Sequence, residues 1–335
     1  MEAHPYERLT PDVVLNALEA VGLRCDGRLL ALNSYENRVY QLGLEAPLDG
    51  QAQVVAKFYR PGRWSEAAIL EEHGFAAELA QAEVPVVAPL ALDGRTLHHH
   101  ADFAFSISPR RGGRPPELDD LEVLEWIGRF LARIHSVGAA ERFDQRPQLA
   151  LASFGTASRD WLLQHQAIPL DVEAAWRQAC DAALAAVAQA FGGAGGGYAE
   201  RFTLLRVHGD CHPGNILWVP DQGPHFVDLD DARTGPAAQD LWMLLSGERA
   251  QRQRQLGALL DGYEQVRDFD RAELALIEPL RTLRLVHYSA WLARRWDDPA
   301  FPAAFPWFGS SAYWKGQVQM LEEQLEAMAE PPLVA

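Results

Sequence analysis

Four polar side chains that could do chemistry lie within the sequence VHGDCHPGNILW, which runs from Val207 to Trp218. In order, they are His208, Asp210, His212 and Asn215. Three interpretations compete. The alternating His and Asp could form a metal site, the aspartate and asparagine could belong to a catalytic loop, or the segment could be a polar turn that leads into a buried strand.

The downstream carboxylates favour a catalytic loop. Four residues separate Asp210 from Asn215, the D-x-x-x-x-N spacing of kinase catalytic loops, and Asp228 follows eighteen positions after Asp210. Phosphoryl transfer asks the protein for an oriented hydroxyl, metal-screened phosphates and exclusion of water. Asp210 could accept the hydrogen bond of an attacking hydroxyl, and Asn215 and Asp228 carry the hard oxygen atoms that Mg²⁺ prefers.

A transition-metal site is the less favoured interpretation. Such a metal usually needs further His, Cys or carboxylate ligands and an ordered second layer of hydrogen bonds. The other histidine cluster, at positions 98–100, follows the sequence DGRT, which is typical of a hairpin turn. It is therefore expected in a different part of the fold.

Transfer from ATP also requires a cation for the phosphates, and the sequence VVAKFY supplies Lys57 in the middle of a predicted strand. Strand alternation places Lys57 on the same face as Val55 and Tyr59. In kinases such a lysine pairs with a glutamate on the following helix. Glu71 and Glu72 are the candidates, and we prefer Glu72, although periodicity alone does not decide between them.

Several other residues have simpler interpretations. Asp230 and Asp231 could extend the metal site, but we expect one of them to be a loop or helix-terminal carboxylate. Asp240, in QDLWMLL, is predicted to brace the catalytic loop through hydrogen bonds, and His212 to shape that loop. Tryptophans near the C-terminus are expected to pack in the core rather than to bind a ligand. They are Trp291, Trp296, Trp307 and Trp314.

A sheet and several helices must position these residues. The run LLALNSYENRVYQLGL predicts two strands around a polar turn, AQVVAKFY predicts a third, and VPVVAPLAL and FAFSIS predict two more. A short helix is expected from Pro11, with Thr10 as its N-cap, and a second helix from about Ser65 to Ala80. The apolar face of the second helix is expected to contain Ile69, Ala76, Ala77 and Ala80.

The rest of the chain is predicted to be mostly helical. DLEVLEWIGRFLARIHSVG has an apolar stripe at helical spacing, and VEAAWRQACDAALAAVAQAF repeats it before GGAGGG, which we interpret as a flexible connector. The composition changes most sharply at PRRGGRPPE, which predicts a hinge loop. We therefore expect a small nucleotide-binding lobe over residues 1–108, a hinge over 109–116 and a large helical catalytic lobe over 117–335.

Charge and composition narrow the classes of function. The 335 residues include 46 acidic and 30 basic side chains, for a formal net charge of −16. Such a surface repels nucleic acid and anionic membranes. Three widely spaced cysteines do not suggest a disulfide framework. Because neither a signal peptide nor a membrane-spanning run is predicted, we expect a cytoplasmic protein. From its charge, we expect it to bind neither nucleic acid nor membranes, and we expect it to be a monomer.

The sequence resembles the bacterial stress response kinase A family, serine/threonine protein kinases within the aminoglycoside and choline phosphotransferase superfamily. H-G-D-x-x-x-x-N and the later aspartate carry the resemblance to the superfamily. The residues that carry the narrower match follow one another along nearly the whole chain. They are LNSYENRVYQ, VVAKFYRPGRW, ILEEH, VHGDCHPGNILW, FVDLDDARTGPAAQDLWMLL, IEPLRTLRLVHYSAWLARRW and DPAFPAAFPW.

This resemblance implies a role for each matched residue. Asp210 is the implied proton acceptor, Asn215 and Asp228 the implied Mg²⁺ ligands, Lys57 the implied phosphate lysine, and Ser34 part of an ATP-contacting turn. The sequence also departs from ordinary protein kinases, because H-G-D replaces H-R-D, D-L-D replaces D-F-G, and the turn NSYENR lacks the glycines of G-x-G-x-x-G. No activation segment is evident, so regulation by phosphorylation of such a segment is not expected.

Together these arguments predict an α+β, two-lobed protein-kinase-like fold of the aminoglycoside phosphotransferase type. The expected activity is Mg²⁺-dependent transfer of the ATP γ-phosphate to serine or threonine hydroxyls of protein substrates, in stress response and with autophosphorylation. The predicted site consists of catalytic Asp210 and Asp228, nucleotide-binding Ser34, Lys57 and Glu72, and the metal ligands Asn215 and Asp228. A small-molecule alcohol phosphotransferase acting on aminoglycosides or choline, and a nucleotide-binding pseudokinase scaffold, remain as alternatives.

Overall fold

The computed structural model describes residues 4–192 and 201–334, and its internal contacts divide the chain into two compact units. The first unit comprises Met1–Pro116, Asp144–Arg146 and Pro213–Ala232, and the second comprises Glu117–Phe143, Pro147–His212 and Arg233–Ala335. Neither unit is therefore continuous in sequence. Most of the predicted connector GGAGGG falls in residues 193–200, outside the described residues. The functional division into lobes and hinge stays a prediction.

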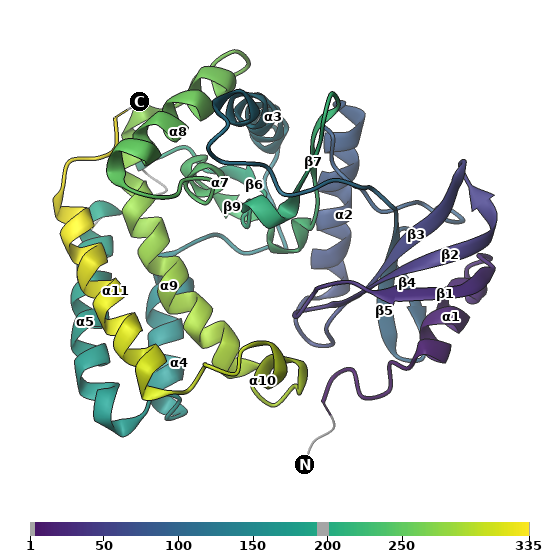
Figure 1. Cartoon of the computed structure of the whole chain (residues 1–335), viewed down its shortest axis with the longest axis horizontal. Coiled ribbons are helices and arrows are strands. Elements are labelled where there is room, and N and C mark those ends of the chain that lie inside the picture. The colour runs from purple at the N-terminus through teal and green to yellow at the C-terminus, as the bar shows by residue number, and fades with distance from the viewer. Residues whose placement is uncertain (1–3, 193–200, 335) are drawn as a thin grey trace. The chain divides into compact units, whose positions relative to one another are not determined.

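The first unit is built around a five-stranded sheet in the order β1-β2-β3-β5-β4, in which all neighbouring strands are antiparallel (Figure 1). A separate antiparallel hairpin consists of β7 and β8. The elements of this unit are α1 (Pro11–Ala20), β1 (Cys25–Ala31), β2 (Arg38–Leu48), β3 (Gln51–Phe58), α2 (Glu66–Gln81), β4 (His98–His100), β5 (Phe103–Pro109), β7 (Ile216–Val219) and β8 (Gly223–Phe226).

Strand β3 separates a hydrophobic core from a polar face, as its alternation predicts. Val54, Ala56 and Phe58 are buried in a cluster with residues of α1, β2 and β5. The opposite face carries Lys57, together with Val55 and Tyr59. Helix α1 covers the core and begins as expected, because the Thr10 side chain accepts a hydrogen bond from the Val13 N–H. The strand thus fixes the direction in which the predicted phosphate lysine points.

One sequence prediction in this unit is wrong, and a second is correct only in part. The segment VPVVAPLAL, residues 84–92, is not a strand, because Pro85 and Pro89 have no N–H to donate to a ladder. Instead the Val87 N–H donates to the Phe226 carbonyl, and the strand that precedes β5 in the sequence is β4, formed by three histidines. The predicted apolar face of helix α2 is correct only in part, since Ile69 and Ala76 are buried but Ala77 and Ala80 are exposed. Its buried residues are Ala68, Ile69, Glu72, His73, Phe75, Ala76 and Leu79.

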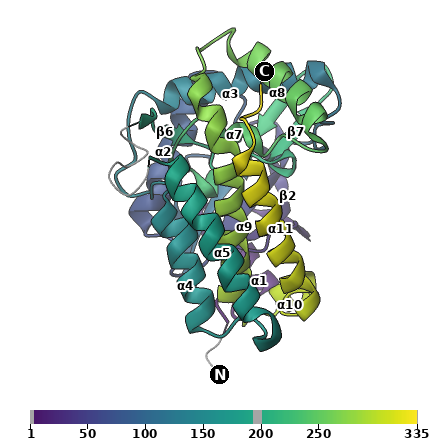
Figure 2. The same ribbon diagram turned by 90° about the vertical axis from the view of Figure 1, so that its left-hand side faces the viewer.

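The second unit is mainly helical. Its elements are α3 (Leu121–Gly138), α4 (Ala157–Gln164), α5 (Leu170–Ala190), β6 (Leu205–Val207), β9 (Arg233–Gly235), α7 (Ala238–Trp242), α8 (Arg249–Tyr263), α9 (Ile277–Arg294), α10 (Ala300–Ala304) and α11 (Ser311–Ala329). Strands β6 and β9 form an antiparallel pair. Helices α5, α9 and α11 run side by side in both views (Figures 1 and 2). The predicted helical character of this part of the chain is confirmed.

Close packing in this unit depends on small residues and on aromatic side chains. A Cβ atom on Gly128 of α3 would lie 1.9 Å from the Leu259 carbonyl oxygen of α8, and one on Gly262 would lie 1.9 Å from the Glu125 oxygen. Only glycine therefore permits this helix contact. Trp314 is fully buried and packs edge-on against Trp176, as expected for a core tryptophan. Within the described residues, every helix is too short or too polar to cross a membrane.

Candidate functional site

Five of the six predicted site residues line one cavity of the first unit, with a volume of about 460 Å³. These residues are Ser34, Lys57, Glu72, Asn215 and Asp228. They come from the turn before β2, from β3, from α2 and from the two ends of the β7–β8 hairpin. Asp210, the sixth, belongs to the second unit. Residues that are far apart in the sequence therefore converge on a single cavity of the first unit.

Apolar residues form a large part of the lining of this cavity. Val39, Val55, Ala76 and Leu217 contribute aliphatic side chains, and residues 110–113 border the cavity as well. A cavity with apolar walls and a few convergent charges is the usual form of a small-molecule site. This one has room for a flat aromatic group beside a polyanion.

Lys57 lies at the centre of the charged end of the cavity. Its Nζ is 3.1 Å from Oδ1 of Asp228, 3.1 Å from Oδ1 of Asp230 and 3.8 Å from Oε1 of Glu72. Burial favours the neutral amine, but these carboxylates outweigh it and raise the pKa of Lys57 well above its usual range. The lysine is therefore a permanent cation facing the cavity.

Asp230 is more important than the sequence interpretation allowed. Its side chain is only 2% exposed and contacts three donors: Lys57, Arg63 and the Asn37 side-chain amide, whose nitrogen is 3.1 Å from Oδ2. Burial opposes the ionisation of this carboxyl, but Arg63 and Lys57 hold its pKa at about 2. Asp230 is a buried structural anion. Arg63, the second arginine in KFYRPGRW, was the only sequence feature that could have indicated a buried anion, but its position does not identify Asp230 as the partner.

Asp230→Asn is expected to lower the free energy of unfolding by about 3–5 kcal/mol, because it leaves the Arg63 and Lys57 charges buried without that anion. Urea denaturation measures the loss. The double variant Asp230→Asn with Arg63→Met should recover part of it, since the unbalanced guanidinium is then removed as well. Additive losses in this cycle would show that the two side chains do not act as a pair.

The structure also separates the roles of the two adjacent glutamates on α2. Glu72 is buried and faces Lys57, whereas Glu71 accepts hydrogen bonds from the backbone N–H groups of residues 144–146, at 2.6–3.0 Å. That segment carries Arg146, whose Nη1 is 3.8 Å from Oε2 of Glu72. Burial raises the pKa of Glu72, and Lys57 and Arg146 offset this only in part. Glu71 thus anchors the segment that supports Glu72.

Glu72→Gln is expected to weaken nucleotide use several-fold, because Lys57 loses a charged neighbour, while Glu71→Gln should mainly reduce stability. Replacing the Glu71 carboxylate weakens three charge-assisted hydrogen bonds, a loss of about 1–3 kcal/mol. The KM for ATP and urea denaturation, measured on both variants, distinguish the two effects. If Glu71→Gln impairs nucleotide use more than Glu72→Gln, the assignment of Glu72 as the partner of Lys57 is wrong.

Asn215 and Asp228 are brought together by the β7–β8 hairpin. Asn215 directly precedes β7, Asp228 follows β8, and the Val227 N–H donates to the Asn215 carbonyl at 3.0 Å. Asp228 has a left-handed backbone with φ of 61°, which non-glycine residues adopt rarely and often at functional sites. Its side chain is 50% exposed and borders the cavity. Both residues border the cavity, and the half-exposed Asp228 carboxylate can contact a cation there.

The loop that carries Asp210 is held by Asp240, as predicted. Oδ2 of Asp240 accepts a hydrogen bond from the His208 N–H and Oδ1 accepts one from the Gly209 N–H, both at 2.8 Å, and His135 contacts the same carboxylate. Gly209 has φ of 83°, which its lack of a Cβ permits. Burial disfavours the charged carboxylate, but the His135 hydrogen bond and charge outweigh it and lower the pKa of Asp240.

Asp240→Asn is expected to cost about 1–3 kcal/mol of stability at neutral pH and to slow catalysis. The amide oxygen of Asn can accept one of the two loop hydrogen bonds, but its NH₂ group cannot accept the other. The lowered pKa means that the Asp240 contribution is present above the ordinary carboxyl pKa and is lost as the pH falls through the folded-state value. Urea denaturation across acidic pH should show the wild type and the variant converging. Asp261→Asn, at an exposed position, is the control. If the stability of the wild type and that of Asp240→Asn differ by the same amount at every pH, the Asp240 carboxylate does not contribute as described.

The Asp210 side chain contacts an arginine and a histidine of the second unit. Nη1 of Arg284, on α9, is 2.8 Å from Oδ1, and Nε2 of His212 is 3.6 Å from Oδ2. The His212 N–H also donates to the Asp210 carbonyl at 2.9 Å, in agreement with its predicted role in shaping the loop. Arg284 was missed, because no spacing rule connects it to a loop about seventy residues earlier in the sequence.

The metal interpretation of H-x-D-x-H has no structural support. Among residues 4–192 and 201–334, no group of three or more His, Cys, Asp or Glu side chains is arranged to hold a metal ion. His208 is fully buried, and the histidines at 98–100 form β4. A magnesium ion that shares its coordination with phosphates and water needs only one or two protein ligands, so this finding does not concern Asn215 and Asp228.

Known proteins resemble the chain over nearly its whole length. Residues 28–277 match the phosphotransferase enzyme family. The chain is 47% identical over 331 residues to stress response kinase A of Escherichia coli K12, which covers 99% of this chain and 97% of that protein. It is 46% identical to the serine/threonine protein kinase RdoA of Salmonella typhimurium, with the same coverage.

Solved structures agree on the fold. An amicoumacin kinase in complex with AMP-PNP, Ca²⁺ and Ami superimposes with a TM-score of 0.70 at 18% identity, over 96% of this chain and 94% of that one. The predicted α+β fold of the aminoglycoside phosphotransferase type is thus confirmed. The chain belongs to the phosphotransferase enzyme family and, within it, to the stress response kinase A family.

Proposed function

We propose that this protein is a Mg²⁺-dependent serine/threonine protein kinase that uses ATP. The observation that carries the proposal is the convergence of Ser34, Lys57, Glu72, Asn215 and Asp228 on one cavity. A pseudokinase scaffold has no chemical need for a phosphate lysine and two oxygen ligands in the same place. The identity with relatives named as protein kinases supports the choice of acceptor.

ATP is proposed to bind with its base between the aliphatic walls and its phosphates toward Lys57. Lys57 is surrounded by the carboxylates of Glu72, Asp228 and Asp230. Two of these, Glu72 and Asp230, are buried and can keep the ammonium in place while it donates to phosphate oxygens. Asp228, which is half exposed, is then available for another partner.

Asn215 and Asp228 fit a magnesium site by the chemistry of their atoms. Both present oxygen ligands, they are adjacent through the hairpin, and both border the cavity in which the phosphates are proposed to lie. When bound, Mg²⁺ would screen the phosphate charges. Screening is needed at this place because the carboxylates of Glu72, Asp228 and Asp230 surround Lys57 and would otherwise repel the phosphates.

Asp210 is proposed to accept the hydrogen bond of the acceptor hydroxyl and to orient it for attack on the γ-phosphate. Asp240 holds the loop backbone, and Arg284 contacts one oxygen of Asp210. These contacts restrict the carboxylate to few orientations, which favours a positioned rather than a mobile base.

The test is to incubate the purified protein with Mg-ATP, alone and with basic protein substrates, and to map phosphate by mass spectrometry. We expect phosphate on serine or threonine hydroxyls of the protein substrates and of the enzyme itself, and the mapping decides whether Ser34, in the turn before β2, is one of these sites. Choline, homoserine and aminoglycosides are offered in parallel. Rapid phosphorylation of one of these alcohols, with none on protein, would replace the protein-kinase proposal by the small-molecule alternative. An absence of any transfer despite nucleotide binding would support a pseudokinase.

A further inference from the structure

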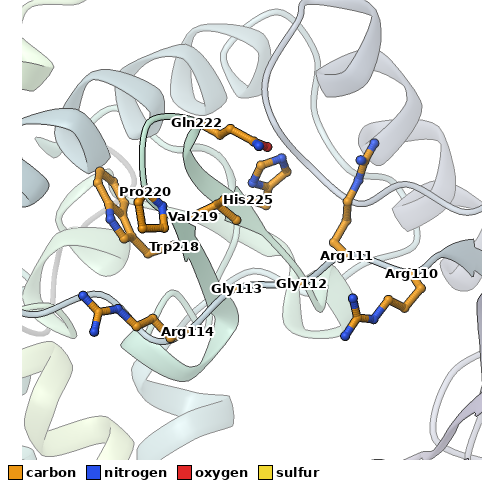
Figure 3. Close-up of a pocket in the computed structure, with 10 residues that line it drawn as sticks. All are labelled: Arg110, Arg111, Gly112, Gly113, Arg114, Trp218, Val219, Pro220, Gln222 and His225. Atoms are coloured by element: carbon orange, nitrogen blue, oxygen red, sulfur yellow. The ribbon is translucent and has the colours of Figure 1, made fainter.

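A second cavity of the first unit, of about 550 Å³, has a strongly basic lining. Ten residues line it, from the loop after β5 and from the β7–β8 hairpin, and no Asp or Glu is among them. The loop contributes Arg110, Arg111 and Arg114, and the hairpin contributes Trp218, Gln222 and His225 (Figure 3). A cluster of this sign is unusual on a chain with 46 acidic and 30 basic side chains.

The guanidinium groups at one end of this cavity are poorly neutralised. Within residues 4–192 and 201–334, the Arg111 side chain forms neither an ion pair nor a hydrogen bond, and that of Arg110 makes one long hydrogen bond, 3.4 Å, to the Gln41 side chain. Both residues are exposed. Figure 3 shows them at one end of the cavity and Arg114 at the other. An anion bound here would meet cationic groups at both ends.

The loop backbone fixes the places of these arginines. Arg114 and Trp218 exchange backbone hydrogen bonds of 3.1 and 2.7 Å, so the loop is attached to β7. Gly113 has φ of 150°, and a Cβ there would lie 2.9 Å from the carbonyl carbon of Leu217. The loop therefore lies directly against the strand, and the spacing of its arginines is a property of the fold.

The length of the basic lining points to a chain rather than to a single small anion. Arg110 and Arg114 are four positions apart, which corresponds to at most about 14 Å of extended backbone. Alternate side chains of an extended peptide are about 6–7 Å apart on one face, so two or three carboxylates of such a peptide could meet the arginines together. The half-buried Trp218 adds aromatic surface beside them.

We propose that this cavity binds an extended, acidic segment of a partner protein. Charge complementarity selects the place: the rest of a surface with net charge −16 repels such a segment, and these arginines attract it. Binding at this site requires neither nucleotide nor catalysis, so the proposal stands apart from the kinase activity proposed above.

Fluorescence anisotropy of a labelled Asp- and Glu-rich peptide with the full chain, in the absence of ATP and Mg²⁺, tests this proposal. Arg114→Glu is the preferred variant, because Arg114 does not border the nucleotide cavity, whereas Arg110 and Arg111 do. We expect Arg114→Glu to weaken peptide binding at least about fivefold, and high salt to weaken it in the wild type. Arg24→Glu, an exposed charge reversal elsewhere in the first unit, should leave the affinity unchanged.

Three results would overturn the proposal. The first is that the acidic peptide does not bind at low salt, or binds no better than the same peptide with Gln and Asn in place of Glu and Asp. The second is that Arg114→Glu and Arg24→Glu have equal effects, which would indicate general electrostatics. The third is that a single-stranded oligonucleotide binds more tightly than the peptide in an Arg114-dependent manner. A protein that shows no kinase activity but binds the peptide as described would leave this proposal standing.

Discussion

Asp210→Ala is expected to slow phosphoryl transfer by about 10²–10⁴-fold while changing nucleotide affinity little. The proposed base acts on the acceptor hydroxyl as the transition state forms, so its loss raises the barrier without removing a ground-state contact to ATP. The structure adds a reason, because the cavity proposed for ATP is lined entirely by residues of the first unit, whereas Asp210 belongs to the second.

Steady-state kinetics and calorimetric titration with an ATP analogue separate the two quantities. Asp160→Ala is the matched control, since Asp160 also pairs with an arginine of the second unit, Arg159, at 2.8 Å but lies outside the loop. Thermal unfolding establishes that Asp210→Ala is folded despite the loss of the Arg284 ion pair. Equal losses of nucleotide affinity and of rate would contradict the assignment of Asp210 as base.

Asp228→Ala is expected to abolish measurable transfer and to remove the Mg²⁺ dependence of nucleotide binding. Asn215 alone is a neutral ligand, and the other carboxylates near Lys57 are buried. Among residues 4–192 and 201–334, no second anion of comparable exposure borders the cavity. In the wild type, ATP should protect the fold against heat only when Mg²⁺ is present. In the variant, ATP should give the same slight protection with and without Mg²⁺.

Thermal unfolding with ATP, with and without Mg²⁺ or a chelator, measures this difference. Asp221→Ala is a close control, because Asp221 lies in the same hairpin and also has a left-handed backbone, with φ of 64° against 61° for Asp228. Both variants place alanine in a strained conformation, and only one removes a cavity carboxylate. Undiminished turnover in Asp228→Ala would exclude Asp228 from the site.

The sequence predicted those parts of the site that depend on patterns among neighbouring residues. The alternation of β3 placed Lys57 opposite the core, and the N-cap and proline at positions 10 and 11 located the first helix. The D-x-x-x-x-N spacing, together with the predicted strands after Asn215 and before Asp228, located these two residues. These patterns are legible because each depends on residues within a few positions of one another.

Local patterns failed where a competing constraint acts. The apolar run at 84–92 has the composition of a strand, but its two prolines leave too few donors for a ladder. The inward face of α2 was misjudged because apolar periodicity cannot identify a face that buries Glu72 and His73. Because Glu72 and His73 are polar, a search for apolar spacing assigns them to the exposed face, although both are buried.

By itself, then, the sequence determined the fold class, the family and the identity of the proposed catalytic residues. Only the tertiary structure decided which side chains become partners. Asp230 pairs with Arg63 and Lys57, Arg284 pairs with Asp210, and the Glu71 carboxylate accepts hydrogen bonds from the backbone of residues 144–146. The physical reason is that buried ions are stable only beside partners, and those partners are chosen by three-dimensional proximity. A separation of more than 70 residues along the chain, as between Arg284 and Asp210, carries no periodic signal that could reveal such a pair.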